Sequence, residues 1–373
     1  MTDSTPLTWN DGAAAAAATA SLPDGPGLSW IALPPTGDTR VLIPREQAAA
    51  GPTALRHLMG HTSLLRRVGA ELGSRMIQFG GDRLLAPRPQ WEMAANRLLG
   101  HARTVAGMPD AVGVIRVNPN RPNRKPVMQL LTPDAERTLG YVKIGWDDLT
   151  APLIRGEIKT LRALQPPDSI RVPEVLGADT GKVPTLAITP VVDDASDRRS
   201  GTPLDLALAA LRVFGPEGFG TDEVGPLAES GALHDARRRL EALDVPYAHD
   251  VLERLDSVVD RFGGLEVAMG RWHGDWNRAN VAVRGDRVAA WDWERSTTGA
   301  PHGLDAAYTL LNEHSPSETL ELLTSAGLEA ERSRALSGLA LVIAATRHAE
   351  AKARGVVSRA AKALRELDEA LAT

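Results

Sequence analysis

The sequence predicts an α+β fold with two lobes, an antiparallel sheet followed by a largely helical half. Three short apolar runs, at residues 112–117, 127–131 and 139–144, have the composition of strands, and the turn sequence Thr132-Pro133-Asp134 joins the last two. Residues 193–270 and 305–371 instead show the longer spacing of helices. This change predicts a sheet lobe at residues 106–192 and a helical lobe at residues 193–373.

Composition excludes several classes of function. Of the 373 residues, 43% are hydrophobic and 24% are charged, which is ordinary for a globular protein. A net charge of −5 predicts no general affinity for nucleic acid. The absence of cysteine excludes disulfides and thiolate catalysis, and suits a reducing cytoplasm. The best apolar run, at residues 339–345, is far shorter than the ~20 residues of a membrane span, so we expect no membrane association.

Residues 1–105 precede the sheet lobe and are predicted to form an accessory α+β module with a flexible start. Residues 29–33 and 41–44 have the composition of two strands, and Pro34-Pro35-Thr36-Gly37-Asp38 separates them as a turn. Residues 53–72 and 90–106 have helical spacing. We expect this module to pack on the sheet lobe, and no function is evident in it.

Lys143 and Glu157 are predicted to pair within the sheet lobe. Lys143 lies in the third strand, and residues 172–178 and 185–188 add two more strands. A helix is expected from about residue 150, with Thr150 as its N-cap. Glu157 shares a face with Ile154 and Leu161, and an inward carboxylate is costly unless it is paired. Lys143 is the obvious partner.

Oxygen-bearing side chains converge on the stretch from Arg271 to Glu294. Residues 281–283 and 288–291 have the composition of a β-hairpin. If Val283 pairs with Val288, Asn280 lies opposite Trp291, and Asp292 returns to the level of Asn280, beside Asp275. Carboxylate and amide oxygens suit Mg²⁺, and a nearby aspartate can accept a proton from an attacking hydroxyl. The alternative is an ordinary polar turn before a hairpin.

His273-Gly274-Asp275, Asn280 and then Trp291-Asp292-Trp293-Glu294 resemble the catalytic signature of the aminoglycoside phosphotransferase and choline kinase-like family, small-molecule relatives of the protein kinases. The resemblance covers residues 106–350 and implies a protein kinase-like two-lobed fold. It implies ATP (or GTP) as co-substrate, Asp275 as the catalytic base, and Asn280 and Asp292 as Mg²⁺ ligands. It also implies that Glu157 holds Lys143 toward the nucleotide phosphates. Val191 would lie in a hinge that contacts the adenine.

One departure concerns the loop at residues 118–125, which contains no glycine. A glycine-rich loop lets backbone N–H groups approach phosphates, so here the charge would come from Arg121, Arg124 and Lys125. Two alternatives to a small-molecule kinase stay open. One is a non-catalytic pseudokinase that binds nucleotide or a partner protein. The other is a metal-dependent phosphohydrolase, which would need neither Lys143 nor Glu157.

The predicted acceptor is a small hydroxyl compound such as an aminoglycoside, amino sugar, sugar or amino alcohol. Only residues 293–304 separate Asp292 from Asp305, which leaves no room for the activation segment of protein kinases. Asp305 would brace the catalytic region or interact with its own helix. Acidic side chains favour a cationic or neutral acceptor over an anionic one; they are Asp193, Asp194, Asp197, Asp205, Glu217, Asp222, Glu223 and Glu229. The exact acceptor, the choice between ATP and GTP, and the oligomeric state stay open.

Overall fold

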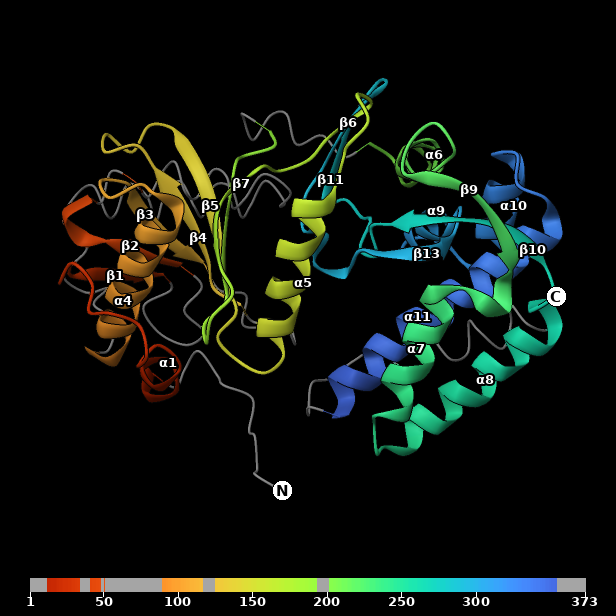
Figure 1. The fold of residues 1–373 in the computed structure, drawn as a ribbon, viewed down its shortest axis with the longest axis horizontal. Coiled ribbons are helices and arrows are strands. Elements are labelled where there is room, and N and C mark those ends of the chain that lie inside the picture. Colours follow the sequence, from red (N-terminus) through yellow and green to blue (C-terminus); the bar gives the residue numbers. More distant parts are fainter. Residues whose placement is uncertain are drawn as a thin grey trace. The chain divides into compact units, whose positions relative to one another are not determined.

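The computed structural model describes residues 12–33, 41–47, 50, 89–116, 125–192 and 201–353. The chain divides into two compact units (Figure 1). Unit 1 comprises Met1–Ala163 and Pro173–Arg198, and unit 2 comprises Leu164–Val172 and Arg199–Thr373. The predicted helices at residues 53–72 and 357–371, and the basic loop residues Arg121 and Arg124, lie outside the described residues.

Unit 1 contains a seven-stranded sheet in the order β1-β2-β3-β4-β5-β8-β7, and every neighbouring pair is antiparallel. The α+β class with an antiparallel-sheet lobe is therefore confirmed. The strands are β1 (Trp30–Leu33), β2 (Val41–Pro44), β3 (Val112–Arg116), β4 (Val127–Leu131), β5 (Thr138–Ile144), β7 (Val175–Asp179) and β8 (Thr185–Ile188). Because β2 pairs with β3, this sheet runs across the predicted boundary at residue 105.

The helices of unit 1 are α1 (Gly12–Ala18), α4 (Pro89–Ala106) and α5 (Thr150–Ala163), with the short turn η1 at Arg45–Gln47. Helix α4 packs closely on the sheet, since a Cβ at Gly177 of β7 would lie 1.8 Å from the Val105 carbonyl oxygen. It also ties down the chain before the edge strand β1, because Asn96 exchanges two hydrogen bonds of 2.9 Å with the backbone of Leu28. The predicted accessory region is thus packed on the sheet.

Unit 2 is mainly helical and has two small sheets. One has the order β13-β10-β9 and the other β11-β12-β6. The strands are β6 (Ile170–Arg171), β9 (Gly220–Pro226), β10 (Glu266–Trp272), β11 (Val281–Arg284), β12 (Arg287–Ala290) and β13 (Thr297–Pro301). Strand β6 pairs in parallel with β12, so a segment from before residue 192 completes a sheet of unit 2. The predicted boundary between residues 192 and 193 therefore differs from the observed one, because unit 1 extends to Arg198 and Leu164–Val172 belongs to unit 2.

The helices of unit 2 are α6 (Pro203–Val213), α7 (Gly231–Glu241), α8 (Pro246–Phe262), α9 (Leu304–Leu311), α10 (Pro316–Ser325) and α11 (Ala330–Ala353), with 3-10 turns η4 (Leu227–Glu229) and η5 (Trp293–Arg295). Capping boxes begin α6, from Thr202 and Asp205, and α10, from Ser315 and Glu318. Among the described helices, none is both long and apolar enough to cross a membrane.

The expectation of helices throughout residues 193–270 was wrong at residues 220–226, because these form strand β9, which pairs with β10. Strand β9 lies at the edge of its sheet. Its sequence, Gly-Thr-Asp-Glu-Val-Gly-Pro, lacks apolar alternation, and Val224 is 59% exposed. An edge strand tolerates polar residues and glycine. Strand β9 therefore lacks the alternation of apolar and polar residues by which a strand is predicted from sequence.

Candidate active site

The predicted hairpin and its register are confirmed. Val283 pairs with Val288, and Val281 pairs with Ala290. The Trp291 backbone N–H then donates to the Asn280 carbonyl at 3.0 Å, which closes the ribbon at the level expected from the sequence. Asp292 follows at once on the returning strand. Strand β10 ends at Trp272 and leads directly into the loop that carries Asp275.

The carboxylate of Asp275 is oriented by two amides from its own loop. Asn277 Nδ2 donates to Asp275 Oδ1 at 2.9 Å, and Asn280 Nδ2 donates to Oδ2 at 2.8 Å. The same two nitrogens also donate to the Asp275 backbone carbonyl, at 3.1 and 3.0 Å. Both carboxylate oxygens therefore keep a fixed direction. Asn277 was not predicted as part of the site, although an asparagine two residues after an aspartate is a local turn signal.

His273 lies beneath the loop as a neutral, buried imidazole. The backbone N–H of Asp275 donates to His273 Nδ1 at 3.2 Å, so Nδ1 carries no proton. The proton is on Nε2, which donates to the Trp291 carbonyl at 3.1 Å. The ring packs against Trp276 and Trp293, with centroids 5.6 and 4.6 Å away. His273 thus joins the loop to the returning strand of the hairpin without contributing charge.

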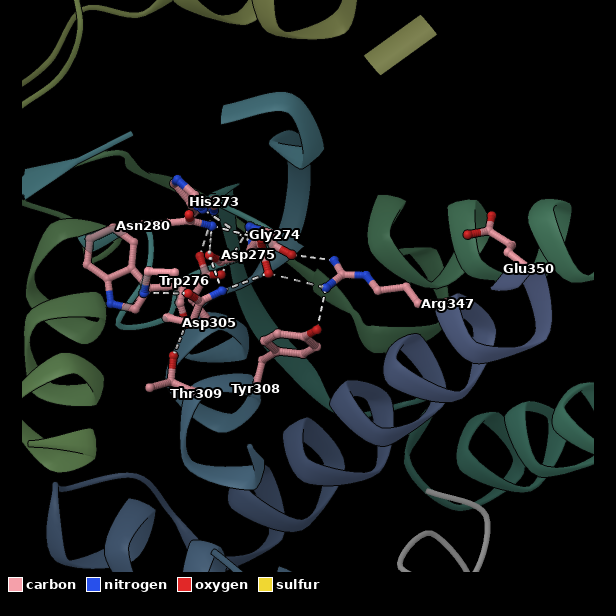
Figure 2. Close-up of polar contacts among 12 residues, drawn as sticks. His273, Gly274, Asp275, Trp276, Asn280, Asp305, Tyr308, Thr309, Arg347 and Glu350 are labelled. Atoms are coloured by element: carbon pink, nitrogen blue, oxygen red, sulfur yellow. Dashed lines mark hydrogen bonds and ion pairs between the residues drawn. The ribbon is translucent and has the colours of Figure 1, made fainter. Parts of the chain in front are cut away.

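Asp305 braces the loop from the first turn of α9 (Figure 2). Its carboxylate accepts the backbone N–H of His273 at 2.6 Å and that of Gly274 at 3.1 Å. Burial raises the pKa of Asp305 to about 7, although these two hydrogen bonds and the charge of Arg347 act to lower it. Of the two roles expected for Asp305, the structure shows the bracing contact directly.

Arg347 reaches the loop from α11, far along the chain (Figure 2). Its Nη2 donates to the carbonyl of Gly274, a residue 73 positions away. Its Nη1 donates to the Tyr308 hydroxyl at 2.5 Å and lies 4.0 Å from Asp275 Oδ1. The guanidinium also stacks over the Tyr308 ring at 4.7 Å from the centroid. Sequence reasoning missed Arg347, because no local motif marks a contact made only by tertiary packing.

The donor atoms near the hairpin fit a hard divalent cation. Asn280 uses its amide nitrogen on Asp275, which leaves its carbonyl oxygen as a ligand atom. Asp292 has the left-handed conformation, with φ 71° and ψ 55°, an uncommon choice outside glycine. An oxygen of Asp292 also lies within 4.8 Å of one of Glu294, which was not predicted as a metal ligand. Two carboxylates and an amide oxygen match the ligands that Mg²⁺ prefers.

In unit 1, the predicted pairing of Lys143 with Glu157 is confirmed. Lys143 Nζ donates to both carboxylate oxygens of Glu157, at 2.6 and 2.8 Å. The two side chains are 7% and 0% exposed. Helix α5 positions Glu157 by burying the face that also carries Ile154, Ile158 and Leu161. The N-terminal cap expected of Thr150 is provided by Asp147, whose Oδ1 accepts the backbone N–H groups of Leu149 and Thr150.

The remaining predicted nucleotide-site residues are only partly placed. Lys125 precedes β4 with its side chain buried, so it is not a solvated loop residue. Val191 follows β8 and is also buried. Arg121 and Arg124 lie outside the described residues.

The tryptophans of this stretch serve mainly in packing. Trp272, Trp276 and Trp293 are buried, and each indole N–H has an acceptor within unit 2. Trp276 Nε1, for example, donates to the Leu206 carbonyl of α6 at 2.9 Å. Buried rings of this kind stabilise the loop and offer no face to a sugar. Trp291 is half-buried.

The chain is similar to several solved kinase structures. It matches a thermostable mutant of aminoglycoside phosphotransferase APH(4)-Ia in its apo form, with a TM-score of 0.45 and 12% identity over 70% of this chain and 94% of that chain. A microcompartment-associated aminopropanol kinase matches with a TM-score of 0.42 and 18% identity over 70% and 90%. The gentamicin-APH(2")-IIa complex matches with a TM-score of 0.45 and 12% identity over 68% and 91%. No protein-family model and no curated protein sequence matches the chain.

Proposed function

We propose that the chain is a phosphotransferase that moves the γ-phosphoryl group of ATP, or GTP, to a hydroxyl of a small molecule. The observation that supports it most strongly is the Asp275 carboxylate, which Asn277 and Asn280 orient from two sides at 2.9 and 2.8 Å. A general base needs such a fixed direction to meet the proton of a bound hydroxyl. A turn aspartate without this task would not need both oxygens to be held.

In the proposed reaction, the acceptor oxygen bonds to the γ-phosphorus while the bond from phosphorus to the bridging oxygen of ADP breaks. The proton of the acceptor hydroxyl passes to Asp275. Asn280, Asp292 and Glu294 would hold Mg²⁺, which neutralises charge on the nucleotide phosphates when it is bound. Lys143, held by Glu157, would bind the phosphates, and Val191 would contact the nucleotide base. Asp305 keeps the loop in position through the backbone of His273 and Gly274.

An acceptor screen with labelled ATP and Mg²⁺ tests this proposal. We expect transfer of label to at least one member of a panel of sugars, amino alcohols, aminoglycosides and hydroxy acids. Asp275→Asn should lower kcat by at least about a hundredfold, because general base catalysis typically contributes that much. Asp286→Asn is the matched control, since Asp286 lies exposed in the turn of the same hairpin.

The outcomes separate the alternatives. Release of inorganic phosphate without any labelled acceptor would favour a phosphohydrolase. Nucleotide binding with no turnover under all conditions would favour a pseudokinase. Efficient labelling of proteins, with every small acceptor inert, would contradict a small-molecule acceptor.

A further inference from the structure

Beside the catalytic loop, unit 2 carries a group of arginines that the proposed reaction does not use. They are Arg295 of η5, Arg347 of α11 and Arg239 of α7. Arg295 is close enough to both other arginines, and to Asp275 and Glu350, to interact with their charges. Cationic side chains repel one another, so their gathering next to a reactive carboxylate calls for a reason.

Two of these arginines meet at Gly274, the residue before the proposed base. Arg347 donates to the Gly274 carbonyl. The backbone and Cβ of Arg295 pack against the other side of the glycine, where an added Cβ would lie 2.5 Å from the Arg295 carbonyl oxygen and 3.1 Å from its Cβ. Arg295 and Arg347 are therefore fixed by the same loop that fixes Asp275.

The Arg295 guanidinium lacks a hydrogen-bond partner within the part of the chain that the structure describes. Its side chain makes no hydrogen bond and no ion pair with any residue that the structure describes. The Arg295 side chain is only half-buried. A half-buried charge in this position is destabilising unless a counter-charge arrives.

The acids nearby are already engaged. Glu350 accepts two hydrogen bonds from Arg239, both at 2.7 Å, and Asp235 forms ion pairs with Arg238 and Arg239. Asp275 is held by the amides of its loop. Arg239 thus has direct carboxylate partners, whereas Arg295 forms no ion pair with a carboxylate among the described residues.

We propose that Arg295 and Arg347 bind an anionic group of the acceptor, a carboxylate or a phosphate, next to the hydroxyl that Asp275 deprotonates. This inference rests on the proposed function and narrows its acceptor to hydroxy acids and phosphorylated hydroxyl compounds. Guanidinium groups bind both anions through paired, charge-assisted hydrogen bonds. An anion bound here would form an ion pair with Arg295 and would also position the acceptor hydroxyl next to Asp275.

This proposal departs from the cationic or neutral acceptor that the acidic residues of the sequence favour. Asp205, one of those residues, is committed to the capping box of α6, where it binds Thr202. Asp193, Asp194 and Asp197 lie outside the described residues. The arginines, in contrast, adjoin the proposed base itself.

Matched acceptor pairs test the proposal in the full chain. Binding of D-glycerate is compared with that of glycerol, and glucose 6-phosphate with glucose, by calorimetry without nucleotide. We expect the anionic member of at least one pair to bind at least about tenfold more tightly, the worth of one hydrogen bond to a charged group. Arg295→Met should abolish that preference, and Arg295→Lys should retain part of it.

Arg237→Met is the control, because Arg237 comes from the same helix as Arg239 but pairs with Asp256 on α8 at 2.5 Å. It should leave the preference unchanged. If Arg295→Met does not fold, the wild-type chain still decides the question, since inorganic phosphate should compete with the anionic acceptor. Equal binding of charged and neutral members in both pairs, or an unchanged preference in Arg295→Met, would overturn the inference.

Failure of this inference and failure of the proposed function give different results. Phosphoryl transfer to neutral or cationic acceptors, without any preference for anions, would leave the kinase intact and remove the anion site. Arg295-dependent anion binding without phosphoryl transfer from Mg·ATP would support the anion site and remove the kinase.

Discussion

At the scale of single residues, the loop that carries Asp275 depends on a glycine. Gly274 has a φ of +82°, a region that other residues rarely adopt. A Cβ there would also lie 2.5 Å from the Arg295 backbone oxygen, which belongs to the main chain and has little freedom to move. The conformation and the contact together explain why no side chain fits between His273 and Asp275.

Gly274→Ala should therefore lower the free energy of unfolding by roughly 2 kcal/mol or more, through backbone strain and overpacking. Denaturant unfolding measures the change. Gly285→Ala is a suitable control, because Gly285 has a φ of +59° but no atom of a described residue lies within 4 Å of an added Cβ. It should show the conformational cost alone, and equal losses in the two variants would contradict the role assigned to the contact.

At the scale of elements, the buried pair of Lys143 and Glu157 joins strand β5 to helix α5 in unit 1. Lys143→Met would take the lysine away from the fully buried Glu157 carboxyl, and should destabilise the fold by about 3 kcal/mol or more. The double variant Lys143→Met/Glu157→Met should recover much of that loss, because apolar groups can replace a buried ion pair at little cost. Thermal unfolding of the single and double variants measures the change. A double variant no more stable than Lys143→Met would contradict the prediction. Lys182→Met, at an exposed turn between β7 and β8, is the control.

Asp305 links helix α9 to the loop that carries Asp275 and makes that link sensitive to pH. Its pKa is raised to about 7 in the fold, against an ordinary value of 3.8, mainly because it is buried. Between these values the folded protein holds a proton that the unfolded chain has released, so this group's contribution to stability falls as pH rises. The groups that face it are the backbone N–H of His273 and Gly274 and the charges of Arg347 and Asp275.

We therefore expect the stability difference between the wild type and Asp305→Asn to shrink from about pH 4 to about pH 7. The asparagine has no titrating proton and keeps only one acceptor oxygen for the two N–H donors. Urea unfolding at a series of pH values measures this difference. A difference that stays constant across the range would show that Asp305 does not titrate there.

The sequence predicts those elements whose pattern lies in neighbouring residues, and misses those that depend on tertiary contacts. The hairpin register follows from Val283, Val288 and the turn between them, and the inward position of Glu157 follows from helical periodicity. Strand β9 lacked such a signal because its residues are polar and it lies at a sheet edge. Arg347 and Arg295 were missed for a different reason: their meeting at Gly274 is a tertiary contact, and an isolated arginine has no periodicity.

At the scale of the whole molecule, the two units each carry part of the predicted kinase signature. Unit 1 holds the Lys143–Glu157 pair, and unit 2 holds the loop with Asp275, Asn280 and Asp292. The chain passes between the two units more than once. Strand β6 lies in Leu164–Val172, between the two segments of unit 1, and pairs with strand β12 of unit 2. A truncation at the predicted boundary of residue 193 would remove β6, one of the two strands that pair with β12.

Nucleotide binding is a further prediction for the full chain. We expect Mg·ATP at a hundred times its dissociation constant to stabilise the fold by about 2.7 kcal/mol. Asp275→Asn should keep most of this effect, because it removes the proposed base and no metal ligand. Asp292→Asn should lose most of it, because it removes a carboxylate from the Mg²⁺ site. Thermal unfolding with ATP, with and without Mg²⁺, measures these shifts.

Identical behaviour of the two variants would contradict this division of roles between Asp275 and Asp292. No shift at millimolar Mg·ATP or Mg·GTP would argue against a nucleotide-dependent function.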